Sequence, residues 1–201
     1  MNSASSASIN FVITLIYTVT FGNAVYQIVE YQETPAVLRM RPDITAGALV
    51  CAGMCMIMAL RFFFGNNRFM EDIFANPHPA GQRLYHFLVT SLQSLVLLGS
   101  SYLIRNPPRF IRWLVLLFSV EVLWYLGCLL FIKSAVRDKQ GAIASHLFVN
   151  EMANIVMAGG ASMFLLAQGL PPNWLSFLVG FIFLGNTAID LWANLSSYMG
   201  D

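Results

Sequence analysis

Six long apolar runs constrain this chain more than any other feature of its sequence. Each run holds roughly 20 residues, and a helix of that length crosses about 30 Å of hydrocarbon. Backbone polar groups inside a bilayer must bond within their own segment, so we expect each run to be a helix. The expected spans are 9–28, 44–64, 84–104, 110–132, 144–166 and 174–194.

The composition favours the same class of protein. Hydrophobic residues make up 57% of the chain and charged residues only 10%, far below the roughly 25% typical of a soluble domain. The sequence therefore predicts an all-α integral membrane protein, a bundle of about six transmembrane helices that forms one domain over residues 1–201. The formal net charge of +1 offers no electrostatic basis for binding nucleic acid.

A short amphipathic pattern lies outside the expected spans, at residues 67–75. Phe69 and Ile73 share one helical face, whereas Arg68 and Glu71 lie elsewhere on the helix. This pattern is typical of a short helix that lies in the membrane interface, and the sequence predicts one here.

Small side chains recur every fourth residue in the second span, at Gly47, Cys51, Cys55 and Ala59. Such a stripe lets helix backbones approach closely in lipid, and we expect it to pack within the chain rather than between subunits. Structural zinc sites normally take four ligands, so two thiols on one helix do not predict a metal. The sequence predicts neither a metal nor another cofactor.

Topology gathers most of the polar and ionisable residues of the spans into one leaflet. With six spans, the even-numbered ones end on the side that carries both termini, and the third and fifth begin there. Charged residues at this depth pair with one another or face water. The predicted polar cluster consists of Arg61, Asn66, His86, His146, Asn150, Glu151, Asn186 and Asp190.

Arg61 and Asp190 are the ion pair that the sequence predicts. Arg61 is the eighteenth residue of its expected span and Asp190 the seventeenth of its own, and the two spans run in the same direction. An unpaired charge at such depth is costly, which favours pairing. The pair is interpreted either as a structural tie between two helices or as the lining of an aqueous vestibule.

Glu121 lies near the middle of the fourth span, and no basic residue is assigned to its depth. Two arrangements satisfy an acid in this position. In the first, Glu121 is a neutral acid bonded to the polar face of the third span through Gln93 and Ser94. In the second, it faces a wet pathway between subunits, where a ring of acids favours cations.

The function predicted from these residues is a channel or transport protein, a homo-oligomeric ion-conducting pore with Glu121, Gln93 and Ser94 along the ion pathway. One alternative is a non-catalytic subunit that packs into a larger membrane complex. A second is a small membrane-embedded enzyme that uses His86, His146 and acids of the polar cluster, although the chain carries no nucleophile elbow or nucleotide loop. The predicted partners are the lipid bilayer and further copies of the chain or other membrane subunits.

Six spans predict that both termini lie on one side, but the basic residues barely orient the bundle. The positive-inside rule assigns the more basic side to the cytoplasm. We expect the termini there, on a bias of one residue. The terminal side is expected to carry Arg61, Arg68, Arg83, Lys133, Arg137 and Lys139, and the other side Arg39, Arg41, Arg105, Arg109 and Arg112.

Overall fold

A computed structural model shows six helices and no strand in the part of the chain that it describes. It describes the backbone of residues 3–33, 45–75, 80–135 and 139–193, and the side chains of residues 11–29, 45–63, 81–130, 151–189 and 192. The predicted all-α fold is confirmed. The helices are α1 (Ser3–Glu33), α2 (Ala46–Ala75), α3 (Ala80–Ser101), α4 (Pro107–Ala135), α5 (Lys139–Ala167) and α6 (Pro172–Ala193).

Five of these helices are long and apolar enough to cross a membrane, which agrees with an integral membrane bundle. In α5 the described apolar segment, Glu151–Ala167, is shorter. The membrane-length segments are Phe11–Val29, Ala46–Phe63, Gly81–Ser101, Pro107–Leu130 and Pro172–Ile189.

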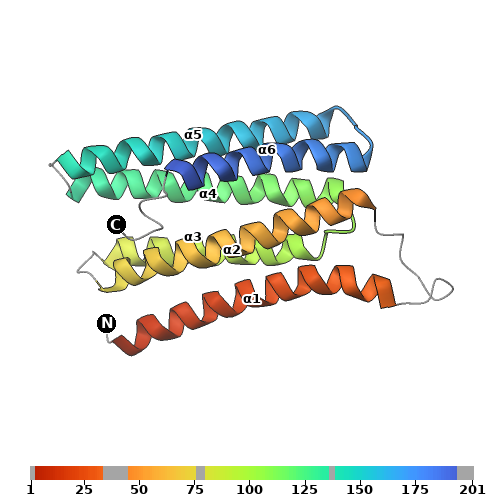
Figure 1. Cartoon of the computed structure of the whole chain (residues 1–201). Helices are drawn as coiled ribbons and strands as arrows, with labels where there is room; N and C mark the ends of the chain where they lie inside the picture. Colours follow the sequence, from red (N-terminus) through yellow and green to blue (C-terminus); the bar gives the residue numbers. More distant parts are fainter. Residues whose placement is uncertain (1–2, 34–44, 76–79, 136–138, 194–201) are drawn as a thin grey trace.

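Successive helices run in alternating directions, so α2, α4 and α6 share one direction (Figure 1). Helix α1 packs against α2 and α3, and α5 packs against α4 and α6. Between these two edges, α2 contacts α6 and α3 contacts α4. We name the end of the bundle where α2, α4 and α6 begin the Pro107 end; it lies at the right of Figure 1.

Local sequence signals set the helix ends at the Pro107 end. Helix α4 begins with Pro107, whose missing N–H is no loss at a first helical position, and the Asn106 side chain accepts a hydrogen bond from the Arg109 backbone N–H. Thr45 accepts a hydrogen bond from the Ala48 backbone N–H and so caps α2. After α5, Gly169 adopts a φ of 64°, the left-handed conformation that commonly ends a helix.

The bundle faces its surroundings with apolar side chains and keeps polar ones inside. Phe181 and Trp192 are 80% and 82% exposed, whereas His86, Gln93 and Glu121 are buried. This distribution suits a lipid environment, in which the outer surface is apolar and intramembrane polar residues turn toward the bundle interior.

The stripe of small residues in α2 packs inside the chain, as predicted. The backbone N–H of Gly47 donates to Asn173 Oδ1 at 3.0 Å, and the Cys51 sulfur lies 3.7 Å from Ser176 Oγ. A Cβ on Gly47 would meet these α6 side chains at 2.9 Å, so the close approach of α2 to α6 requires glycine. Cys55 and Ala59 are also buried.

The short interfacial helix predicted for residues 67–75 is not a separate element. Helix α2 continues without interruption from Ala46 to Ala75. The side chains of its last turns lie outside the described residues, so the predicted amphipathic face stays a prediction. Because α2 has no break, Arg61 lies near the middle of a long helix and not close to its end.

Candidate functional site

A buried ion pair joins α2 to α4. Arg61 Nη2 lies 3.8 Å from Glu121 Oε1, and the two side chains are only 9% and 4% exposed. Arg61 lies fifteen residues after Ala46 and Glu121 fourteen residues after Pro107, so the two residues lie at the same depth from the Pro107 end. The prediction that no basic residue shares the depth of Glu121 is therefore wrong.

Buried residues of the other helices lie at similar distances, counted along each helix, from the Pro107 end. His86 is fifteen residues before the end of α3, Glu151 sixteen before the end of α5, and Asn186 fourteen after the start of α6. All three are almost completely buried. These three residues, the ion pair and the neighbouring Thr187 together form what we name the polar layer: Arg61, His86, Glu121, Glu151, Asn186 and Thr187.

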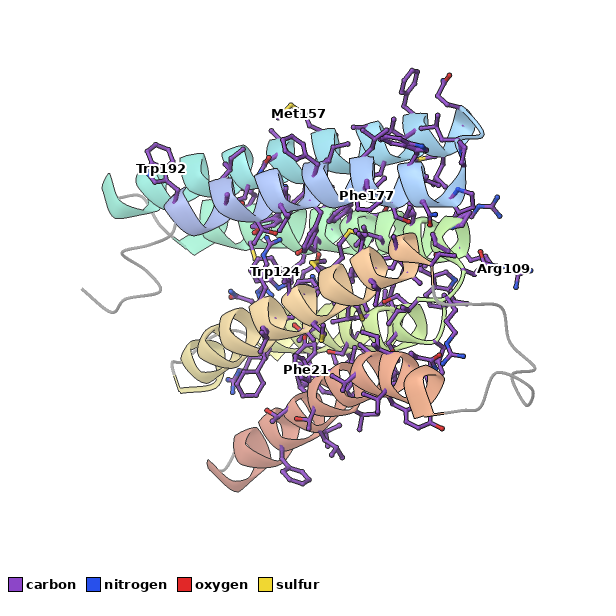
Figure 2. The ribbon with its side chains drawn as sticks, turned by 45° about the vertical axis from the view of Figure 1, so that its right-hand side comes forward. Phe21, Arg109, Trp124, Met157, Phe177 and Trp192 are labelled. Carbon is purple, nitrogen blue, oxygen red and sulfur yellow. The ribbon has the colours of Figure 1, made fainter. Side chains whose placement is uncertain are left out.

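His86 packs against aromatic rings of α3 and α4. Its ring centroid lies 6.2 Å from that of Trp124 in an edge-on arrangement, and 5.5 Å from that of Tyr85. The Tyr85 hydroxyl donates a hydrogen bond to the carbonyl oxygen of Leu123. Figure 2 shows Trp124 inside the bundle, in contrast with Met157 and Trp192 on its outside. Trp124 lies one helical turn after Glu121, so α3 places His86 close to the level of the ion pair.

The antiparallel register of α3 and α4 places Thr90 within one residue of the level of Glu121. Tyr85 lies against Gly127 near one end of this helix pair, and Trp113 lies against Gly99 near the other. Counting inward from these contacts brings the backbone of Glu121 opposite that of Ser91, so Thr90 lies one residue away from this level. Thr90 is fully buried, and its Oγ1 has no hydrogen-bond partner among the described residues.

Gln93 and Ser94 do not bond to Glu121 as the first sequence interpretation required. The Ser94 hydroxyl donates to the Thr90 carbonyl oxygen at 2.8 Å, so its donor serves its own helix. Gln93 Oε1 is buried and has no hydrogen-bond partner in the described part of the chain. Both residues nevertheless lie on the buried face of α3 that carries His86 and Thr90.

Helices α5 and α6 meet at the polar layer through two asparagines. The Asn154 side chain donates to the backbone carbonyl oxygen of Asn186 at 3.4 Å. The Asn186 side-chain amide and Thr187 Oγ1 are buried, and within the described ranges neither has a hydrogen-bond partner. Unsatisfied buried polar groups are costly in a protein interior, which makes this cluster a candidate site for a polar ligand.

Several residues of the predicted cluster cannot be placed. The side chains of Asn66, His146, Asn150 and Asp190 lie outside the described residues, so the Arg61–Asp190 pair stays a prediction. The sequence interpretation did not single out Trp124 or Thr187. A usable signal was their spacing, since Trp124 follows Glu121 by three residues and Thr187 adjoins Asn186.

Glu121 also does not face a neighbouring subunit. Its carboxylate lies inside the bundle of a single chain, between α2 and α4. A ring of Glu121 carboxylates around an axis between subunits requires an outward-facing acid. The predicted pathway between subunits therefore does not fit Glu121, and any route through this residue runs inside one chain.

The described residues contain no group of three or more metal-ligating side chains. The comparisons with known proteins give no further guide to the site, because no family model, curated protein or solved structure matches this chain.

Proposed function

We propose that this protein transports a small ion across the membrane, and that the ion passes through the polar layer inside one bundle. The buried Arg61–Glu121 pair carries the proposal. Ionisable residues within membrane helices are costly, and they mark ion pathways and proton relays in proteins that move charge.

Polar groups from both sides of the ion pair support this reading. On one side, α3 supplies His86, Thr90 and Gln93; on the other, α5 and α6 supply Glu151 and Asn186. Transport sites commonly lie within the membrane, where side chains of several helices converge. A tie between two helices needs only Arg61 and Glu121, whereas the polar layer draws on five helices.

Assembly and orientation stay predictions. The pair inside the bundle removes Arg61 from the basic residues that decide orientation, which leaves five on each side and no bias. The alternating helix directions support termini on the same side. Accessibility labelling of cysteines placed at both termini in sealed membrane vesicles tests this; labelling from opposite sides would contradict it.

Reconstitution into liposomes tests the proposed function. Wild-type protein is expected to dissipate an imposed gradient of H⁺, Na⁺ or K⁺, and Glu121→Gln is expected to abolish that flux. Arg105→Gln is the matched control, because Arg105 lies outside the polar layer at the Pro107 end. Transport that survives in Arg105→Gln but not in Glu121→Gln would support the proposal.

The alternative function is a non-transporting membrane subunit in which the ion pair only holds α2 against α4. The observation in its favour is the pair itself, since each charge already has a partner of opposite sign. Wild-type protein that moves none of the three ions in any lipid mixture would overturn the transport proposal and favour this alternative.

A further inference from the structure

The fixed charge beside Glu121 restricts which ion can use the polar layer. The guanidinium of Arg61 lies 3.8 Å from the carboxylate and keeps its proton at all relevant pH values. A metal ion bound at Glu121 would stand a few ångströms from this cation, where the two repel strongly in a poorly hydrated interior. Cation sites in proteins are lined by several oxygen ligands, whereas a guanidinium lies beside the Glu121 carboxylate.

A proton also adds a positive charge beside Arg61, but it occupies no separate site in the interior. It binds covalently to the carboxylate and needs no shell of ligands, and it converts Glu121 from an anion to a neutral acid. The ion pair then opens because the Coulomb attraction to Arg61 is lost. When the proton leaves, the carboxylate and the pair are restored, and no other atom or electron has moved.

Few other groups near Glu121 carry charge or titrate. Among the described residues, α2 supplies Arg61, α3 supplies His86, and α5 supplies Glu151 at a similar distance from the Pro107 end. Tyr125 and Cys128 of α4 and Tyr85 of α3 lie within about two helical turns, and the ordinary pKa values of Tyr and Cys lie well above neutral pH. Helix α6 supplies Asn186 and Thr187, which do not titrate; the side chain of Asp190 lies outside the description. His86 is therefore the described group best suited to exchange protons near neutral pH.

Thr90 offers a link between His86 and Glu121. It lies one helical turn after His86 on the same buried face, one residue from the position opposite Glu121 in the register of α3 and α4. A hydroxyl both donates and accepts a hydrogen bond, so it can take part in a chain that passes protons. In the described part of the chain, the Thr90 hydroxyl is not engaged by any other group.

We propose that the transported ion is the proton, carried by Glu121 and exchanged through His86. This inference rests on the proposed function, transport of a small ion, and specifies which ion is transported. It requires that the wild-type protein conduct H⁺ and exclude Na⁺ and K⁺.

Ion selectivity of the wild-type protein is the first test, and it needs no variant. Liposomes with an internal pH dye receive a proton gradient, and liposomes with an internal Na⁺- or K⁺-sensitive dye receive a gradient of that metal ion at constant pH. The expected result is a fast pH change with the proton gradient and no metal-ion flux. Flux of Na⁺ or K⁺ without H⁺ would overturn the inference and leave the proposed transport function standing. Absence of all three fluxes would overturn both.

Variants then test the two named groups. Glu121→Gln is expected to reduce proton flux to that of protein-free liposomes, and His86→Gln to slow it and change its pH profile. Ser119→Ala is the matched control, since Ser119 lies on the exposed face of α4 and bonds only to the Val115 carbonyl among the described groups. A thermal unfolding curve for each variant verifies folding. Proton flux unchanged in folded Glu121→Gln would overturn the inference.

Discussion

Two arginines, one in the polar layer and one at the Pro107 end, have different kinds of hydrogen-bond and ion-pair partner. Arg61 lies in the polar layer and faces a carboxylate, whereas Arg105 lies at the Pro107 end and donates from Nε and Nη2 to the backbone carbonyl oxygen of Gln27, at 3.2 and 2.7 Å. Arg105 follows the last turn of α3 and is partly exposed, so water can hydrate it. A neutral acceptor suffices near the membrane edge; an opposite charge is needed in the interior.

The hydroxyl and amide groups follow the same division. Near the Pro107 end, Asn23 donates to Ser101 at 2.7 Å, and the Ser100 and Ser176 hydroxyls donate to carbonyls of their own helices. In and beside the polar layer, Thr90 and Asn186 keep buried side-chain atoms that no described group satisfies. The half near the Pro107 end satisfies its polar groups within the chain, whereas the polar layer contains buried polar atoms that no described group satisfies.

The largest expected effect comes from breaking the ion pair. Arg61→Ala strands the Glu121 carboxylate in the interior and should lower the free energy of unfolding by about 3–5 kcal/mol. Combining it with Glu121→Ala should recover part of this loss, because no charge is then left unpaired. Unfolding of the four proteins in detergent micelles measures the coupling. Strictly additive single effects would contradict the pair.

Steric substitutions test whether the two halves are packed equally well. Gly127→Val should collide with the Tyr85 ring beside the polar layer, and Gly99→Val with the Trp113 ring toward the Pro107 end. We expect each to lower the free energy of unfolding by about 1–3 kcal/mol. Gly160→Val is the control, because a Cβ on Gly160 meets nothing within 4 Å. A much smaller cost at Gly127 would mean that the polar layer is loosely packed.

Arg105→Ala should have a smaller effect than Arg61→Ala. It removes two charge-assisted hydrogen bonds but leaves only a neutral carbonyl near water, so we expect a loss of about 1.5 kcal/mol in the free energy of unfolding. The exposed Arg109→Ala, in the first turn of α4, should leave stability unchanged. Thermal unfolding of both variants measures the difference. Equal losses from Arg105→Ala and Arg61→Ala would remove the contrast between the two halves.

The smallest expected effect concerns the bond between Asn23 and Ser101. Hydrogen bonds between membrane helices contribute about 0.6 kcal/mol on average, and Asn23→Ala should lower the free energy of unfolding by this amount. Its coupling to Ser101→Ala, measured in a double-mutant cycle, should account for most of the loss. A coupling of several kcal/mol would show that this half also depends on its polar contacts.

The sequence interpretation identified both Arg61 and Glu121 but did not predict that they pair, because it placed the starts of two helices wrongly. The fourth span was expected to begin at residue 110 and the second at 44, which makes Glu121 the twelfth residue of its span and Arg61 the eighteenth. The helices begin at Pro107 and Ala46, and these shifts bring the two residues to equal depth. Proline is favoured at the first position of a helix, so Pro107 was the sequence feature that could have located the start of α4.

The sequence by itself determined that this chain is a bundle of membrane-spanning helices; the gathering of polar residues in one leaflet stays a prediction. The bundle follows from a local property, since an apolar run either is long enough to cross the hydrocarbon or is not. Only the tertiary structure decided that Glu121 pairs with Arg61, that Ser94 bonds to its own helix and that the acid faces the interior. These outcomes depend on how each helix is rotated and shifted against its neighbours, and packing between distant parts of the chain sets both.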